Sequence, residues 1–225
     1  MSALAHLESL LRERKLDVTL TTAAPWRRAA EERACTGVPS IDDALGGGLR
    51  RGHLSEIVGP RSAGRTTLLV HALAAAASRG EAVALVDPCD RFDPVSAVTL
   101  GLDPARLLWV RGTGDASSAL VALKAMNLIL QAGNFGLVAL DLSDVPATAM
   151  RAFPFTTWLR MSRVIEGSQT VALLVGADRL ARSAGGVTVA LDRPSSLTHV
   201  AWTGESHRAR LLDAIAIHLR VVAAR

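Results

Sequence analysis

A glycine-rich stretch is the part of this sequence with the clearest chemical meaning. Its residues are Gly59, Pro60, Arg61, Ser62, Ala63, Gly64, Arg65, Thr66 and Thr67, named here the glycine loop. In loops of the pattern G-x-x-x-x-G-K-[ST], backbone N–H groups surround phosphates, the lysine contacts the outer phosphates and the hydroxyl holds Mg²⁺. Here Arg65 occupies the lysine position. Arginine keeps the charge but is wider and forked, so we expect a degenerate nucleotide-binding loop with weak or absent ATP and Mg²⁺ binding.

Two aspartates follow apolar runs downstream of this loop. Asp141 follows Leu137–Leu140, and Asp87 follows Ala82–Val86. A carboxylate at a strand end next to a phosphate loop is the usual protein contribution to Mg²⁺ binding. An aspartate after an apolar run is also a common turn residue. The glycine loop upstream favours Asp141 as the metal-orienting, Walker B-like residue.

Apolar runs and helical stretches alternate through the middle of the chain. The strand-like runs are Leu54–Val58, Ala82–Val86, Leu107–Val110, Leu137–Leu140 and Thr170–Val175. The helical stretches are Thr66–Ser78, Pro94–Leu100, Ala116–Gln131 and Ala147–Ile165. Strands that are apolar on both faces and separated by helices predict an α/β fold, with a mainly parallel sheet covered by helices on both sides.

The two ends of the chain have other patterns. Gly186–Asp192, Leu197–Trp202 and Ile215–Val222 alternate apolar with polar or small residues, which predicts antiparallel strands at the C-terminal edge of the sheet, although the last could also be a helix. Near the N-terminus, one stripe of an amphipathic helix is formed by Leu4, Leu7, Leu10 and Leu11, and we expect it to dock on a partner. These patterns divide the chain into an N-terminal helix and linker, residues 1–35, and a core domain, residues 36–225.

The composition excludes several classes of protein. Apolar residues make up 49% of the 225 residues and charged residues 20%, which excludes a disordered or fibrous chain. No apolar run approaches the roughly 20 residues of a membrane span, and no secretory signal is visible. Two cysteines are too few for a disulfide framework or a zinc site. We therefore expect a cytoplasmic protein with no membrane partner and no bound metal.

Positive charge is concentrated at the C-terminal end. Residues 151–225 contain 10 basic and 5 acidic side chains, whereas residues 1–150 contain 15 basic and 16 acidic ones. Lys15 and Lys124 are the only lysines among the 25 basic residues. This arginine preference reflects either a codon bias, which we favour, or guanidinium chemistry. A basic face of this kind is compatible with binding to a phosphate backbone.

Four arginines are candidates for DNA contacts. Arg179 and Arg182 lie among small residues after the last predicted parallel strand, where they would suit close approach to phosphates; an ordinary solvated connection is the alternative. Arg160 and Arg163 lie one helical turn apart beside Trp158. Aromatic and arginine side chains together can stack on single-stranded bases, but packing of Trp158 in the core or against a partner is the interpretation we favour.

A wider set of segments resembles the core of RecA-type recombinases. These segments are Thr36–Leu49, Gly52–Pro60, Thr66–Leu69, Val86–Pro94, Leu100–Asp103 and Leu107–Leu108. The resemblance covers roughly residues 36–222 and implies a RecA-like P-loop core. It also implies a DNA-binding loop after the last parallel strand. Because RecA-type subunits associate partly through an N-terminal helix and strand, it makes the N-terminal leucine stripe the natural docking element.

The sequence departs from this family at two positions that matter for catalysis. In RecA recombinases a glutamate two residues after the aspartate matching Asp87 activates the attacking water, and here that position holds Cys89. The glutamine that senses the γ-phosphate is replaced in the region of Gly176. Losing a general base costs about 10²–10⁴ in rate, so we expect no significant hydrolysis. We interpret Cys89 as a small buried residue rather than a reactive thiol.

A short RecA-like core, an N-terminal helix and an arginine-rich C-terminal third are together similar to the ImuA family. This resemblance implies a non-catalytic accessory protein of SOS-induced mutagenic translesion synthesis and DNA repair. Its implied partners are RecA, DNA, ImuB, which is an inactive Y-family polymerase relative, and an error-prone C-family DNA polymerase. One alternative is an active DNA-dependent ATPase of the RecA superfamily, in which Asp87 or Asp90 replaces the glutamate. A weaker alternative is an SOS cell-division inhibitor.

Overall fold

The computed structural model describes residues 32–115, 118–151, 153–181, 186–192, 200–203, 211–215 and 218–223. Residues Glu32–Arg225 form one compact unit. The predicted N-terminal stripe of Leu4, Leu7, Leu10 and Leu11 lies outside the described residues, and so does Arg182.

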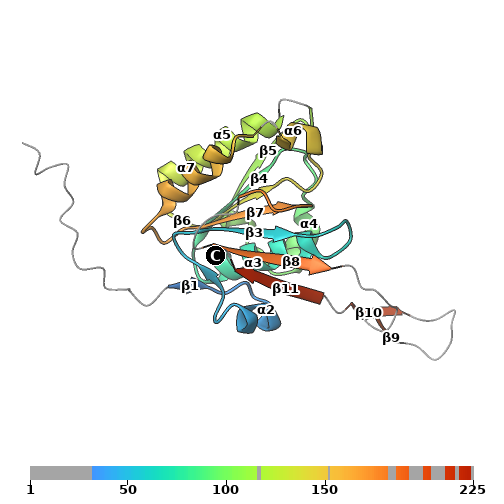
Figure 1. The fold of residues 1–225 in the computed structure, drawn as a ribbon. Helices are drawn as coiled ribbons and strands as arrows, with labels where there is room; N and C mark the ends of the chain where they lie inside the picture. Colours follow the sequence, from blue (N-terminus) through green and yellow to red (C-terminus); the bar gives the residue numbers. More distant parts are fainter. Residues whose placement is uncertain are drawn as a thin grey trace, which may run out of the picture. The chain divides into compact units, whose positions relative to one another are not determined.

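A seven-stranded sheet forms the centre of the fold (Figure 1). Its strands, in spatial order, are β11 (His218–Ala223), β8 (Val187–Asp192), β3 (Leu54–Val58), β7 (Val171–Gly176), β6 (Phe135–Asp141), β4 (Ala82–Asp87) and β5 (Leu107–Arg111). From β8 to β5 every neighbouring pair is parallel, and β11 pairs antiparallel with β8. This confirms the predicted α/β fold with a mainly parallel sheet and an antiparallel strand at the C-terminal edge.

Two details of the C-terminal region differ from the prediction. Strand β8 was expected to be antiparallel but runs parallel to β3, with Glu56 opposite Thr188. The strand expected near Leu197–Trp202 is β9 (Val200–Thr203), which pairs antiparallel with β10 (Leu211–Ile215) in a separate two-stranded sheet. Alternating apolar residues identify a strand, but its partner and direction depend on the path of the connecting chain.

Helices cover both faces of the sheet (Figure 1). On one face lie α3 (Arg65–Ser78) and α2 (Pro39–Ala44), and on the other lie α5 (Ser118–Ala132) and α7 (Phe155–Ile165). The described residues also form three shorter elements, α4 (Pro94–Thr99), α6 (Ala147–Arg151) and η1 (Pro104–Arg106), and β1 (Arg33–Ala34) pairs antiparallel with β2 (Leu49–Arg50). Within the described part of the chain, no helix is both long and apolar enough to cross a membrane.

The helix predicted over Ala147–Ile165 is interrupted. It forms α6 and α7 instead, and Pro154 immediately precedes α7 with an extended backbone. Proline disfavours the helical conformation for the residue before it. The break therefore starts a separate helix with its own buried face, on which Trp158, Met161 and Ile165 lie.

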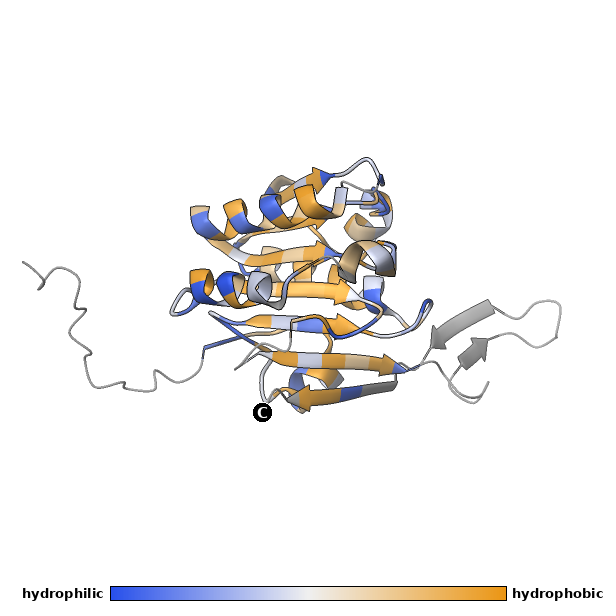
Figure 2. Cartoon of the chain, turned by 45° about the horizontal axis from the view of Figure 1, so that its top comes forward, coloured by the Kyte–Doolittle hydropathy of each residue, from blue (hydrophilic) through white to orange (hydrophobic). Residues whose placement is uncertain are grey.

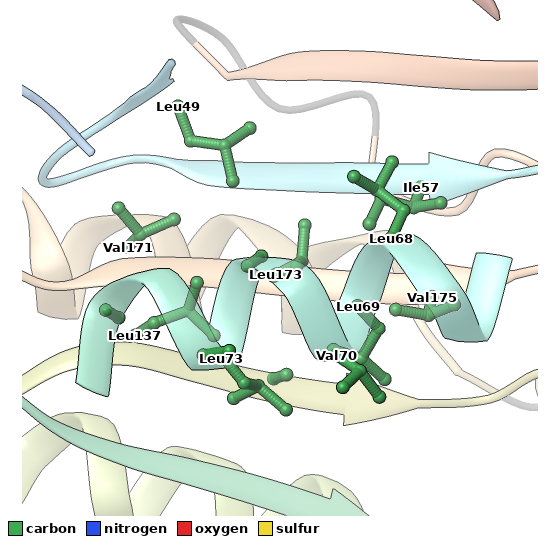
Figure 3. Close-up of a cluster of buried hydrophobic side chains, with 14 of the residues drawn as sticks. Leu49, Ile57, Leu68, Leu69, Val70, Leu73, Leu137, Val171, Leu173 and Val175 are labelled. Atoms are coloured by element: carbon green, nitrogen blue, oxygen red, sulfur yellow. The ribbon is translucent and has the colours of Figure 1, made fainter. Parts of the chain in front are cut away.

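The core is formed by the central strands and the helices packed on them. Strand β7 is buried along all six residues, and the central strands are apolar for most of their length (Figure 2). Figure 3 shows leucines of α3, including Leu68 and Leu73, packed over Ile57 and Leu173. Burial of each such side chain contributes about 1.5–3 kcal/mol. This packing fixes the position of α3, and therefore of the glycine loop before it.

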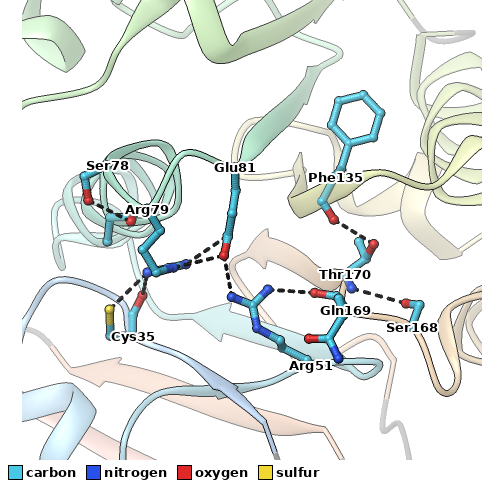
Figure 4. A network of polar contacts seen from close by, with 10 residues as sticks. Cys35, Arg51, Ser78, Arg79, Glu81, Phe135, Ser168, Gln169 and Thr170 are labelled. Atoms are coloured by element: carbon cyan, nitrogen blue, oxygen red, sulfur yellow. Dashed lines mark hydrogen bonds and ion pairs between the residues drawn. The ribbon is translucent and has the colours of Figure 1, made fainter.

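A charged network joins segments at the amino ends of the strands (Figure 4). The Glu81 carboxylate accepts hydrogen bonds from Arg51 and Arg79. Arg51 also donates to the Gln169 carbonyl at 2.7 Å, and Arg79 donates to the Cys35 carbonyl at 3.2 Å. These contacts connect the residues that precede β3, β4 and β7. The network therefore stabilises the sheet at the edge opposite the carboxyl ends of its parallel strands.

Candidate functional site

The carboxyl ends of four neighbouring parallel strands bring the predicted site residues to one edge of the sheet. The glycine loop follows β3, Gly176 ends β7, Asp141 ends β6 and Asp87 ends β4. Strand β7 lies between the strand of the glycine loop and the strand of Asp141. Ligands of open parallel sheets bind at this edge, so the topology places the predicted residues where a site would be expected.

The glycine loop connects β3 to α3 through a left-handed turn. Ser62 and Gly64 have φ angles of 63° and 95°, and Gly64 is the N-cap of α3. At Gly59 a Cβ atom would lie 2.4 Å from the Leu191 carbonyl oxygen, so only glycine fits there. The first N–H groups of the 14-residue α3 have no partner within the helix. Together with the helix dipole they favour an anion.

Arg65 begins α3 with its side chain inside the protein. The residue is 7% exposed, and its Nη1 atom is enclosed without a hydrogen-bond partner. A buried N–H group without an acceptor costs about 1–3 kcal/mol. An anion seated in the glycine loop would supply an acceptor of the kind that Nη1 lacks, so this part of the site fits the phosphates of a nucleotide.

The carboxylate expected to orient Mg²⁺ is Asp141, at the end of β6. Asp141 accepts a hydrogen bond from the Ser143 N–H at 2.9 Å. Burial raises the pKa of the Asp141 carboxyl above its ordinary value; the contacts with Ser143 oppose this only in part, and the neighbouring Asp87 adds to it. A metal ligand of this type must be ionised. A cation bound next to Asp141 would lower the pKa of this carboxyl and favour that form.

Cys89 occupies the position of the implied catalytic glutamate, two residues after Asp87. It is half-buried and packs against the apolar cluster beneath α5 and α7. Burial raises the pKa of the Cys89 thiol, and the nearby carboxylates of Asp144, Asp87 and Asp141 raise it further. The thiolate, not the thiol, is the reactive form. At neutral pH this side chain is therefore neither a general base nor an activated nucleophile.

The two carboxylates considered as replacement bases are engaged in other contacts. Asp87 is 2% exposed and accepts a hydrogen bond from the Phe92 N–H at 2.8 Å, which holds the turn after β4. Asp90 receives two hydrogen bonds from Arg111, each 2.7 Å long, and these lower the pKa of Asp90. A carboxylate with a lowered pKa is a weaker base. Both carboxylates therefore already accept hydrogen bonds from groups of the protein.

The candidate DNA-binding arginines lie on two different elements. Arg160 and Arg163 are on the exposed side of α7, and Arg179 is exposed in the connection after β7. Trp158 is 2% exposed and makes an edge-to-face contact with Phe153. Core packing of Trp158 is therefore confirmed, and stacking of its ring on DNA bases is wrong, because the apolar face of α7 turns the ring inward.

The sequence reasoning missed three features. Arg61 at the glycine loop forms a 2.8 Å ion pair with Asp144 in the segment after β6. Glu56, within the apolar run of β3, is buried at 3% exposure; a charged residue inside such a run was the available signal. A cavity of about 160 Å³ lies between the end of β5 and α5, and Val110 and Val121 are among its lining residues. No local sequence pattern marks that cavity.

The candidate site lies in the part of the chain that matches a known protein family. The RecA N-terminal domain matches residues 23–151. Protein RecA of Synechococcus sp. (strain CC9605) is 37% identical over 125 residues, which are 56% of this chain and 32% of that protein. Protein RecA of Prochlorococcus marinus (strain MIT 9211) is 36% identical over 125 residues, with the same shares of 56% and 32%. The matched region spans about a third of these relatives. The glycine loop, Cys89 and Asp141 all lie within residues 23–151.

Proposed function

Because the chain belongs to the RecA N-terminal domain family, we propose that it is a non-catalytic, RecA-like accessory protein of mutagenic translesion DNA synthesis. In this proposal it is of the ImuA type and acts in the SOS response to DNA damage, by contact with DNA and other proteins rather than by ATP hydrolysis. The observation that carries the proposal is Cys89, a half-buried neutral thiol at the position of the implied catalytic base.

The other groups at the carboxyl ends of the parallel strands support the proposed absence of ATP turnover. Asp87 and Asp90 already accept hydrogen bonds from Phe92 and Arg111, and burial raises the pKa of Asp141 above its ordinary value. Loss of a general base alone lowers a rate by about 10²–10⁴. The glycine loop retains features that fit phosphate, so the proposal allows weak nucleotide binding without hydrolysis.

A partner surface is available beside β5. In the described part of the chain this strand pairs only with β4, so one of its edges is open. The cavity is lined by residues at the ends of β4 and β5 and on α5, and Leu120, Val121 and Leu128 of α5 are exposed. A strand that has an open edge and also lines an apolar cavity suits an extended peptide with apolar side chains. We assign this surface to RecA, and leave ImuB and the error-prone C-family polymerase as further proposed partners of the same assembly.

The proposed DNA contacts are electrostatic. Arg160, Arg163 and Arg179 are exposed and carry the guanidinium groups that suit phosphate oxygens. Contacts of this kind release counterions, so binding should weaken steeply as the salt concentration rises. They carry no sequence information, which agrees with a protein that acts at damage in any sequence.

Nucleotide binding and hydrolysis, measured together with and without single-stranded DNA, test the main proposal. We expect turnover at background level in both conditions, with active RecA as the positive control. Turnover that rises with DNA and is lost in Asp141→Ala would contradict the proposal and favour an active DNA-dependent ATPase.

The proposed RecA contact is tested by adding the protein to RecA filaments on single-stranded DNA. We expect changed filament length or slowed strand exchange. Val121→Asp at the cavity should weaken the effect, whereas Val95→Asp, the same substitution at an exposed position on α4, should not. Unchanged filaments and strand exchange with the wild-type protein would rule this contact out.

A further inference from the structure

Glu56 is a buried carboxylate that the nucleotide chemistry does not use. It lies in the middle of β3, and its Oε1 atom accepts hydrogen bonds from the Leu180 N–H at 2.7 Å and the Ala181 N–H at 2.8 Å. Its Oε2 atom accepts one from the Thr188 hydroxyl at 3.3 Å. A buried charge is tolerated only where hydrogen bonds replace its lost water. These donors compensate for the burial of Glu56 and fix its side chain.

These contacts hold the connection between β7 and β8 at two places. Leu180 and Ala181 lie in its first half, and Thr188 lies in β8 just after its end. Ser55, next to Glu56, accepts a hydrogen bond from the Val187 N–H at 3.3 Å. Two consecutive side chains of β3 thus anchor a segment that is more than 120 residues away in the sequence. Arg179 is exposed immediately before the first anchored amide.

The link between this connection and the glycine loop is weaker. The Gly59 N–H donates to the Gly176 carbonyl at 3.3 Å. Gly176 has no side chain that could extend to a ligand in the loop. The orientation of the connection is therefore set by the carboxylate on β3, which is present whether or not the loop holds an anion.

We propose that Glu56 is a positioning residue for a contact between Arg179 and the phosphate backbone of single-stranded DNA. It holds the first half of the connection in one orientation independently of nucleotide, so the DNA affinity does not depend on ATP. This inference rests on the DNA binding proposed above. The anchoring itself can be measured without DNA, which separates failure of the anchor from failure of DNA binding.

Hydrogen exchange of backbone amides tests the anchor. In Glu56→Ala, exchange at Leu180 and Ala181 should become roughly tenfold to a hundredfold faster, because hydrogen bonds to a charged acceptor are lost. Glu56→Gln keeps an acceptor but loses the charge and should give a smaller increase. Glu166→Gln, at an exposed position, is the matched control and should give none. Unchanged exchange in the Glu56 variants overturns the proposal; if Glu56→Ala does not fold, Glu56→Gln decides.

Fluorescence anisotropy with a labelled single-stranded oligonucleotide tests the consequence. The wild-type affinity should change less than twofold when ATP and Mg²⁺ are added. Glu56→Ala and Arg179→Ala should each lower the salt dependence of binding by about one phosphate contact, and the double variant should lose no more than either alone. A large effect of ATP, or additive losses, contradicts the proposal. A wild-type protein that binds no DNA removes the DNA contact, while the exchange experiment still decides the anchor.

Discussion

Replacing Glu81 by glutamine should destabilise the fold in a pH-dependent way and leave the carboxyl-edge site unchanged. The Glu81 carboxylate is joined to Arg51 at 2.5 Å and to Arg79 through two hydrogen bonds of 3.1 Å. The Glu81 side chain is 21% exposed and that of Arg51 is 13% exposed. The network is therefore neither a fully exposed ion pair nor a fully buried one.

The size of the effect follows from that intermediate burial. Hydrogen bonds to charged groups contribute about 1.5–3 kcal/mol each, whereas exposed ion pairs contribute about 0–1 kcal/mol. Glutamine keeps the shape and one acceptor oxygen but loses the charge that both arginines share. We expect the free energy of unfolding at pH 7 to fall by about 1–2 kcal/mol.

The pH dependence provides a sharper check. Burial alone raises the pKa of Glu81, but hydrogen bonds from Arg79 and Arg51 outweigh it and lower the pKa below the ordinary value of 4.5. A lowered folded-state pKa means that the stabilisation is present above the unfolded-state pKa and is lost as the pH falls through the folded-state pKa. The difference between wild type and Glu81→Gln should therefore shrink in acid.

Urea denaturation followed by circular dichroism, from pH 7 down to pH 3.5, measures this difference. Glu166→Gln removes an exposed carboxylate and should change stability by less than about 0.5 kcal/mol. A Glu81→Gln effect that is absent at pH 7, or equal at pH 7 and in acid, would refute the reasoning.

Three further outcomes follow from the site and the core. Burial raises the pKa of Asp141, so ionisation of this carboxyl lowers the stability of the folded state as the pH rises above about 3.8. Asp141→Asn should therefore gain stability relative to wild type between pH 3 and pH 7. A difference in the free energy of unfolding that stays constant over this range in urea denaturation would contradict this. Cys35 is exposed, whereas Cys89 is half-buried with a raised pKa, so mass spectrometry should find Cys35 alkylated first at pH 7. Trp158→Ala should lower the free energy of unfolding by about 3–5 kcal/mol, measured in urea; a loss below 1 kcal/mol would mean that the ring is not in the core.

Most of the sheet could be predicted because buried parallel strands are continuous apolar runs in the sequence. The run Leu137–Leu140 is apolar on both faces, and it lies within β6, whose strand extends to Asp141. The glycine loop was equally visible, since its residues are contiguous and their backbone requirements are local. The break at Pro154 was missed because the helical pattern continues on both sides of it, although the proline itself was a signal.

The candidate site was predictable only in part. Features formed by residues close together in the sequence could be predicted, and contacts between distant residues could not. That Cys89 stands two residues after Asp87 can be read directly from the chain. The hydrogen bond between Asp90 and Arg111, which is 21 residues away, cannot be read from the chain in this way. A replacement base therefore seemed available until the pairing of its carboxylate was known.

The sequence by itself determined the α/β order of elements, the glycine loop with arginine in the lysine position, and the absence of a glutamate beside Asp87. Each is a local property of residue type and period. Only the tertiary structure decided that Arg65 is enclosed without an acceptor, that β8 runs parallel to β3, and that Glu56 holds amides 124 and 125 residues away. The period of the hydrophobic residues indicates which face of a helix or strand is buried. Hydrogen-bond partners and pKa shifts depend instead on which distant segments the packing brings together.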